Sequence, residues 1–414
     1  MTQIAKLIRS DRFVLFSILL IGLAIRSFSW WYQGGYMGSA ESEFETMGRT
    51  IIQGNWELYF KANRPHQPVY GLLLSPVYLL RLSLPAYVFV LHTTLSLGTI
   101  YLVYKTTSEF FNLLCGQIAA FLVAVNLMMA YWFPWTSGDI PFHFFLSWFA
   151  FCAASAWMNP RPASVFIFFL SGLICSLTRP EGFFVVVVAF LVLLFRILSI
   201  GGLSFQKNVL VLICLVFFCA STAAVILTSH KRVREVFFSN MHVAYALYIS
   251  TRMSTNSPAE QTAAYNSMGL VTERAQNRPG FVSPNYALSM EGLSFMREKP
   301  VTWLKMYFFR LTSIIFPSLY CPRCSVRNNI YSFTLSFILF VGSVLAVILK
   351  SEKRFQAIGI TIMGMTIAMS ISLFQRELDY RVPLSMHILF SIAAPFGWYQ
   401  LCSMIRQNGH ETSK

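Results

Sequence analysis

Long, almost uncharged hydrophobic runs alternate with short polar segments along most of this chain. Each of about ten runs is long enough for a helix to cross a hydrocarbon layer, which takes roughly 20 residues. Runs such as VVVVAFLVLLF are continuous, whereas strands of a membrane barrel alternate, so the pattern predicts helices. We expect spans near residues 13–31, 84–104, 116–134, 141–158, 162–178, 182–200, 208–228, 330–349, 355–374 and 383–402.

The distribution of positive charge predicts how these spans are oriented. Lys6, Arg9 and Arg12 precede the first span, which places the N-terminus in the cytoplasm. Counting spans from there puts the short basic loops on the same side, including 350–354. The apolar segment 301–320 would move that loop outside if it crossed the membrane. We therefore expect 301–320 to be a re-entrant or interfacial helix on the outer side.

The predicted fold is thus an all-α polytopic membrane protein with two outer segments too long to be simple turns. Its expected parts are a transmembrane module at 1–228 with a first outer loop at 32–83, an outer loop with the interfacial helix at 229–329, and C-terminal transmembrane helices at 330–414. Helical periodicity within 32–83 predicts juxtamembrane helices there. Long loops in compact proteins are often functional, so the chemistry is expected on this side.

Composition agrees with a membrane location and narrows the classes of ligand. The chain is 56% hydrophobic and only 12% charged, and its net charge is +15. In a membrane protein such a charge favours anionic head groups or a phosphate-bearing substrate over nucleic acid. The sequence has neither a phosphate-binding glycine loop nor an HExxH motif, which argues against ATP-driven chemistry and zinc proteolysis.

Acidic residues gather directly after the first span, in ESEFETMGRTIIQGN (41–55). Glu41 and Glu45 lie one helical turn apart, Arg49 lies one turn further, and Glu43 points elsewhere. A partly buried carboxylate there could act as a general base. For Glu45 we favour a simple solvated ion pair with Arg49. For Glu41 we favour a functional role.

Three further charged residues lie at the outer ends of predicted spans. Asp139 could cap the next helix, as could Ser137, or it could be a site residue between aromatic-rich spans. Arg179, in LTRPEGFF, and Arg381, in ELDYRVPLS, could snorkel to head groups or hold a substrate phosphate. Arginines and acids on one face together favour a site that handles an anion.

Two cysteines in the second outer segment form the motif CPRC. Cys321 and Cys324 lie outside in this topology, where a disulfide is permitted. The pair could also bind zinc, although two further ligands at a suitable spacing are not evident.

The order of these motifs resembles the GT-C glycosyltransferases, in particular the protein-mannosyltransferase and lipid A aminoarabinose transferase branch (glycosyltransferase family 39-like). The matching features, in chain order, are Glu41 with Phe44, Gly48 and Gly54; RPHQPVYGLLL (64–74); Asp139; LTRPEG (177–182); EGLSFMREKPVTWLKMYFFRL (291–311); and DYRVP (379–383). Two positions depart from the family pattern. Ala40 replaces the first acid of the pair, leaving Glu41, or Glu43 in a shifted register, as base. Asp379 replaces an arginine, leaving Arg381.

The resemblance implies a reaction and a set of roles. A sugar would pass from a polyprenyl-phosphate donor to a lipid, glycan or protein acceptor by inverting direct displacement. Glu41 or Glu43 would act as base, and Asp139 would orient the acceptor or assist that base, while Arg179, Arg381 and Arg64 would bind the donor phosphate. No cofactor is required, although some relatives use a divalent metal ion. The expected location is a bacterial inner membrane with the site facing the periplasm.

Two other classes of function remain open from the sequence. A transporter or flippase for a lipid-linked or anionic solute would use the same basic, aromatic walls without chemistry. No inverted repeat is evident, and the candidate polar residues cluster at the outer surface, which favours the enzyme. A scaffold subunit of an envelope assembly would explain the departures at Ala40 and Asp379 and would tolerate substitution of the acids.

Overall fold

The computed structural model describes residues 11–38, 43–55, 68–199, 284–315, 326–374 and 381–411, with short pieces at 248, 263, 266–271 and 273. This part of the chain is helical apart from turns and one isolated β-bridge between Met37 and Trp135. The all-α prediction is therefore confirmed.

The helices follow the predicted hydrophobic runs. They are α2 (Asp11–Tyr32), α3 (Glu43–Ile52), α5 (Pro68–Leu79), α6 (Leu84–Phe110), α7 (Leu113–Ala124), α8 (Leu127–Tyr131), α9 (Asp139–Met158), α10 (Pro162–Thr178), α11 (Pro180–Ser199), α16 (Pro284–Glu298), α17 (Pro300–Ile315), α18 (Val326–Ile348), α19 (Arg354–Phe374) and α20 (Arg381–Glu411). Every predicted span overlaps a described helix except 208–228, which lies outside the described residues. Within the described part, 6 spans are long and apolar enough to cross a membrane, as an integral membrane protein requires.

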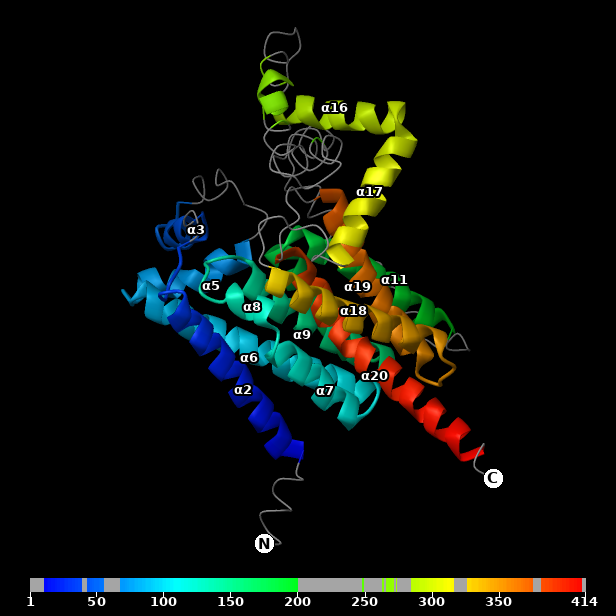
Figure 1. The fold of residues 1–414 in the computed structure, drawn as a ribbon. Helices are drawn as coiled ribbons and strands as arrows, with labels where there is room; N and C mark the ends of the chain where they lie inside the picture. The colour runs from blue at the N-terminus through cyan, green and yellow to red at the C-terminus, as the bar shows by residue number, and fades with distance from the viewer. Residues whose placement is uncertain are drawn as a thin grey trace. The chain divides into compact units, whose positions relative to one another are not determined.

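The chain divides into two compact units. The first comprises Met1–Cys214, Ile338–Ile367 and Leu384–Lys414, and the second comprises Leu215–Phe337 and Ala368–Pro383. In the first unit, α6 packs against α7 and α9, and α2 lies along α6 and α7 (Figure 1). Helix α10 packs between α9 and α11. In the second unit, α16 and α17 are consecutive helices that meet at Lys299 and pack against each other.

A break at Asn126 divides the predicted span 116–134 into α7 and the short helix α8. The Asn126 side chain accepts hydrogen bonds from the backbone N–H groups of Met128 (3.1 Å) and Met129 (3.2 Å), which caps α8. The last carbonyls of α7 then need other donors, and that of Val123 accepts from the N–H of Asn126 at 3.4 Å. Arg26 of α2, only 2% exposed, donates to Ala124 O (3.0 Å) and Val123 O (3.3 Å), so a buried cation closes this helix end.

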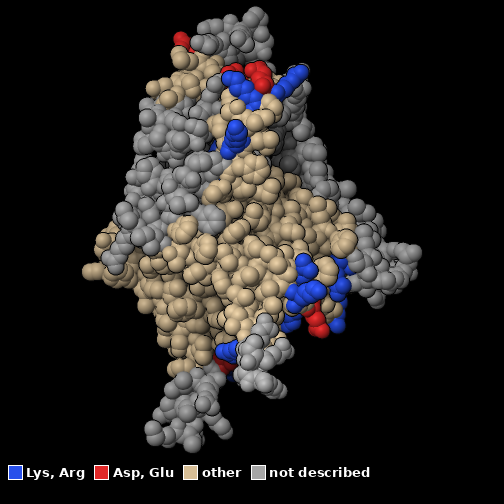
Figure 2. Space-filling view, turned by 45° about the vertical axis from the view of Figure 1, so that its right-hand side comes forward, with Lys and Arg blue, Asp and Glu red and all other residues tan. Residues whose placement is uncertain are grey.

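The outward surfaces of the helices are apolar. Large side chains are exposed along them, including Phe28 of α2, Val90 of α6 and Phe195 of α11. Figure 2 shows a wide continuous surface of uncharged residues on this face of the molecule. Apolar surface of this extent is unusual for a protein in water and is expected where helices face lipid.

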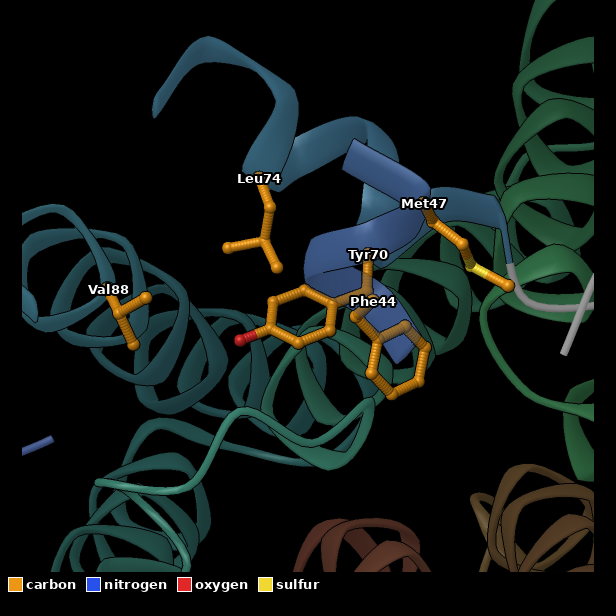
Figure 3. Packing of buried hydrophobic residues seen from close by; sticks show 5 residues of the cluster. All are labelled: Phe44, Met47, Tyr70, Leu74 and Val88. Carbon is orange, nitrogen blue, oxygen red and sulfur yellow. The ribbon is translucent and has the colours of Figure 1, made fainter. Parts of the chain in front are cut away.

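The predicted juxtamembrane helices of the first outer loop are present as α3 and α5, which pack against each other. Their interface is a small core of Phe44, Met47, Tyr70 and Leu74, with Val88 of α6 beside it (Figure 3). The ring of Phe44 meets that of Tyr70 edge to face, with 5.0 Å between centroids. Glycine allows the close crossing, because a Cβ on Gly71 would lie 2.7 Å from the Cβ of Met47.

The C-terminal part of the first unit closes through α18 and α20. Trp398 Nε1 of α20 donates to the backbone oxygen of Ile338 at 3.0 Å, and the two helices approach closely at Gly342 and Gly397. The Lys353 ammonium, in the turn before α19, donates to the backbone oxygen of Phe111 at the end of α6. That lysine therefore neutralises a helix C-terminus.

The predicted interfacial segment 301–320 is helical up to Ile315, where α17 ends, and residues 316–325 lie outside the described part. Its placement against a membrane surface stays a prediction, as do the predicted domain boundaries.

Candidate active site

The polypeptide after α2 is bonded to the polypeptide before α9. The Met37 N–H donates to Pro134 O at 3.0 Å, and the Thr136 N–H donates to Met37 O at 3.3 Å, which forms the parallel bridge of Met37 with Trp135. Gly38 is the last described residue before Glu41, and Thr136 lies three residues before Asp139. The two segments that carry the predicted acids therefore approach each other.

Side chains at the end of α2 reinforce this junction. Ser29 Oγ donates to Ala130 O at 2.6 Å, and Gln33 Nε2 donates to Tyr131 O at 2.8 Å. Both acceptors belong to α8, and the carbonyl of Ala130 also accepts from the N–H of Phe133 at 3.1 Å. Trp135 Nε1 in turn donates to Gln33 Oε1 at 3.4 Å. The C-terminal end of α2 is thus attached to the segment that leads to Asp139.

Tyr36 connects Glu45 to the same segment. Its phenol donates a hydrogen bond to Glu45 Oε1 and lies 3.4 Å from Thr136 Oγ1. Burial, together with the hydrogen bond to Glu45, raises the pKa of Tyr36, so the phenol keeps the proton that it donates.

The expected ion pair of Glu45 with Arg49 is absent from the ion pairs that the structure describes. Glu45 instead accepts from Tyr36, and the Arg49 guanidinium lies over the ring of Tyr78, 5.1 Å from its centroid. The prediction was wrong because Tyr36, which folds back onto α3, competes for Glu45. Spacing along a helix cannot reveal such a residue.

Asp139 is the first residue of α9, and its side chain is 3% exposed. The N-cap of α9 is Gly138, and no side chain caps the helix there. The structure thus contradicts the interpretation of Ser137 or Asp139 as a capping residue. A buried carboxylate needs a charge partner or several hydrogen-bond donors, and Asp139 finds its charge partner in Arg179.

Arg179 holds two carboxylates at once. Its Nη1 is paired with Asp139 Oδ1, while Nε and Nη2 donate to Glu181 Oε2 at 3.2 Å and Oε1 at 3.0 Å. Its side chain is 19% exposed, and its cation lies 5.8 Å from the centroid of the Phe142 ring. Burial alone would lower the pKa of Arg179, but the charges of Glu181 and Asp139 raise it above its ordinary value. A snorkelling role is therefore wrong for this arginine.

The LTRPEG turn explains why Arg179 points at these acids. Helix α10 ends at Thr178, Arg179 is extended (φ −152°, ψ 147°), and Pro180 opens α11. Gly182 is required by a close approach of backbones, since a Cβ there would lie 2.5 Å from the oxygen of Cys175. The turn is tight enough for Glu181 to fold back onto the guanidinium two residues earlier.

One turn along α9 from Asp139, His143 lies within electrostatic reach of both Asp139 and Arg179. The residue is 3% exposed, and its Nε2 has no hydrogen-bond partner. A histidine nitrogen left unpaired beside a buried ion pair is unusual, because such atoms are normally bonded to protein or to water.

The remaining predicted site residues are placed only in part. Glu41 and Arg64 lie outside the described residues, as do Cys321 and Cys324. Glu43 begins α3 and Arg381 begins α20 in the second unit, and the side chains of both are outside the described part. Among the described residues, no group of three or more His, Cys, Asp or Glu side chains could hold a metal ion.

Sequence reasoning missed two contributors to this region. Glu181 was not considered a candidate, although its position two residues from Arg179 across a proline allowed a turn-back pair. Tyr36 had no recognisable signal beyond its place in the aromatic cluster after the first span.

No family model and no curated protein matches this sequence. Two structures of an Archaeoglobus fulgidus oligosaccharyltransferase resemble the fold. One is tethered with an acceptor peptide containing the NVT sequon, with TM-score 0.45 and 13% identity over 94% of this chain and 50% of that chain. The other is in complex with an inhibitory peptide and a dolichol-phosphate, with TM-score 0.48 and 14% identity over 92% and 50%. The chain therefore spans about half the length of these structures.

Proposed function

We propose that this chain is a membrane glycosyltransferase that moves a sugar from a polyprenyl-phosphate donor to an acceptor at the outer face of the membrane. The observation that carries the proposal is the bonding of Met37 to Pro134 and Thr136. It brings the segment entering the Glu41–Glu43 region next to the segment entering Asp139. Two carboxylate-bearing loops at the ends of membrane spans suit a reaction on a lipid-linked substrate.

In the proposed reaction, the acceptor hydroxyl or amine attacks the anomeric carbon of the donor sugar. The bond from that carbon to the phosphate oxygen breaks, and the polyprenyl phosphate leaves with the electron pair. Glu41, or Glu43 in the shifted register, takes the acceptor proton. Attack opposite to the leaving group inverts the anomeric carbon. The donor carries its own leaving group, so the reaction needs no nucleotide.

Asp139 is proposed to orient the acceptor, and its pairing gives Arg179 a different role from the one expected. All three guanidinium nitrogens of Arg179 already donate to carboxylates. Three of its five N–H groups are thereby used, and the two carboxylates would repel a phosphate at this cation. We therefore assign Arg179 to positioning Asp139, and we assign stabilisation of the departing phosphate charge to Arg381 and Arg64.

The proposal is tested by following radiolabel from a panel of polyprenyl-phosphate sugars into membrane extracts. Wild type is compared with Glu41→Gln, Glu43→Gln and Asp139→Asn. Glu109→Gln is the matched control, because Glu109 is an exposed carboxylate whose partner Lys105 lies 3.9 Å away on the same helix.

Loss of the general base is expected to reduce transfer by about 100-fold or more, while Glu109→Gln retains wild-type transfer. Full transfer by both Glu41→Gln and Glu43→Gln would show that neither carboxylate is the general base. If wild type transfers nothing from any donor but carries labelled lipid across the membrane, the protein is a transporter instead.

A further inference from the structure

A buried series of hydrogen bonds, separate from the ion pairs of Arg179, also reaches the segment before Asp139. The Tyr70 phenol of α5 lies 2.8 Å from His92 Nε2 of α6, and His92 Nδ1 lies 2.7 Å from the backbone oxygen of Phe133. All three residues are 0% exposed. The series connects a juxtamembrane helix, a spanning helix and the loop that precedes α9.

The acceptor at one end fixes the direction of every hydrogen bond in this series. A carbonyl oxygen only accepts, so the proton must be on His92 Nδ1. A neutral imidazole then has a bare Nε2, which accepts from the phenol of Tyr70. Burial raises the pKa of Tyr70 well above its ordinary value, so its proton is available for this bond. Tyr70 thus selects the tautomer of His92 that can hold Phe133.

The segment from Phe133 to Thr136 is therefore held from two sides. His92 binds the carbonyl of Phe133, and Met37 binds the carbonyl of the next residue, Pro134. These two bonds come from outside the segment and add to its own turn hydrogen bonds, such as Trp135 N–H to Trp132 O at 3.2 Å. The loop has only a few residues between these bonds and the start of α9 at Asp139.

We propose that His92 and Tyr70 are positioning residues, which hold the 133–138 loop so that Asp139 meets its substrate. The inference rests on the proposed function for the identity of that substrate, whereas the holding of the loop is a property of the folded chain. This role distinguishes the Tyr70–His92 hydrogen bond from contacts that only pack α5 against α6.

A neighbouring tyrosine provides the matched control. The phenol of Tyr87, on α6, donates to the backbone oxygen of Leu73 in α5 at 2.8 Å. Tyr87→Phe therefore removes a bond of the same length between the same two helices without touching the 133–138 loop. Any effect shared by Tyr70→Phe and Tyr87→Phe comes from helix packing, and the difference between them reports on the loop.

The direct test is the accessibility of a cysteine placed in the loop. Ser137 is suitable because the residue is 8% exposed and its Oγ has no hydrogen-bond partner among the described residues, so Ser137→Cys breaks no described bond. The full-length protein with Ser137→Cys is treated with a water-soluble maleimide. Labelling of the peptide containing residue 137 is followed by mass spectrometry, so the native cysteines remain in place.

Loss of the bond to Phe133 is expected to raise the labelling rate at residue 137 about tenfold, because a buried carbonyl loses its only side-chain donor. His92→Phe and His92→Gln should show this increase. His92→Asn places an N–H near the position of Nδ1 and should restore slow labelling. Tyr70→Phe should give an intermediate rate, and Tyr87→Phe the rate of the parent. Equal rates in His92→Phe, Tyr70→Phe and Tyr87→Phe would overturn the inference, and if His92→Phe fails to fold, the comparison of His92→Asn with His92→Gln decides.

A kinetic measurement separates this inference from the proposed function. In the transfer assay, His92→Gln is expected to lower kcat about tenfold with little change in KM for the donor, because the loop carries Asp139 rather than the phosphate site. If wild type shows no transfer, the proposed function fails, yet the labelling rates still decide whether His92 holds the loop. If labelling rises while kcat is unchanged, His92 holds the loop but does not serve the reaction.

Discussion

The guanidinium of Arg179 is paired with the buried carboxylate of Asp139, although 40 residues separate them in the chain. Glu181 accepts from Nε and Nη2 of the same guanidinium, so one cation at the end of α10 pairs with two anions at the starts of α9 and α11. Neighbouring ends of three helices are thereby joined through side chains.

Removing the partners of Arg179 is expected to have unequal effects. The Asp139 side chain is 3% exposed and that of Glu181 is 15% exposed, so Asp139 is the more desolvated anion. Asp139→Asn should cost about 1.5–3 kcal/mol of stability, and Glu181→Gln should cost less. Thermal unfolding in detergent measures the order. Arg179→Met should be worse than either, at about 3–5 kcal/mol, because it leaves two carboxylates together. Equal midpoints for all three variants would contradict the described pairing.

Tyr36 gives a prediction for alkaline pH. Its folded-state pKa is raised above the ordinary value of 10.0 by burial and by Glu45. The folded protein therefore binds this proton more tightly than the unfolded chain does. The stabilisation is fully present below pH 10 and is lost as the pH rises towards the folded pKa. Wild type should lose stability above pH 10 more steeply than Tyr36→Phe, in unfolding midpoints recorded from pH 8 to 11. Parallel curves would argue against a buried phenol.

Gly182 is expected to be intolerant of any side chain. An alanine Cβ there would lie 2.5 Å from the backbone oxygen of Cys175, and neither backbone can yield without moving the LTRPEG turn. Gly182→Ala should cost about 1–3 kcal/mol. Gly359→Ala is the matched control on another apolar helix, because its Cβ would meet only Val192 Cγ1 at 3.6 Å. If both variants unfold at the wild-type temperature, the close crossing of α10 and α11 is not as described.

The same hydropathy that predicted the spans could not predict where one of them breaks. Residues 116–134 form a continuous apolar run, and the break at Asn126 depends on one side chain that caps α8. An asparagine within a hydrophobic run can also lie in an unbroken helix with its side chain facing a neighbouring helix. Residue patterns predicted the positions of the helices because lipid imposes one requirement on every span. The helix caps inside a hydrophobic run depend on local side-chain contacts instead.

The candidate site was predictable in outline for a similar reason. Topology alone put Asp139 and Arg179 at the same side of the membrane, so their proximity followed from counting spans. Their pairing, with Glu181 completing the guanidinium, depends on side-chain directions that spacing does not encode. His92 and Tyr70 had no signal at all, because a buried histidine in an apolar helix has the same sequence pattern whether it packs or positions a loop.

Arg26 gives a prediction inside the bilayer region. Arg26→Leu would leave the carbonyl of Ala124 without this donor, at a cost of about 1–3 kcal/mol for a buried unsatisfied group, while the carbonyl of Val123 keeps the N–H of Asn126. Arg26→Lys retains an N–H donor and a charge and should be the milder change. Unfolding temperatures in detergent distinguish the two. If the Arg26→Leu protein is as stable as wild type, the free energy lost by desolvating the cation equals the free energy gained from its hydrogen bonds.

The pairing of Arg26 with the end of α7 also has a consequence for biogenesis. The acceptor Ala124 lies 98 residues further along the chain, so the ribosome releases the first span well before its counterpart exists. During that interval α2 carries an arginine with nothing in its own helix beyond Gly22 O to bind. A charge at that depth is costly in hydrocarbon, so the nascent first span should dwell in a hydrated or translocon-lined environment until α7 emerges. Lateral release of this protein into lipid is therefore expected to be a late, collective event rather than helix-by-helix partitioning.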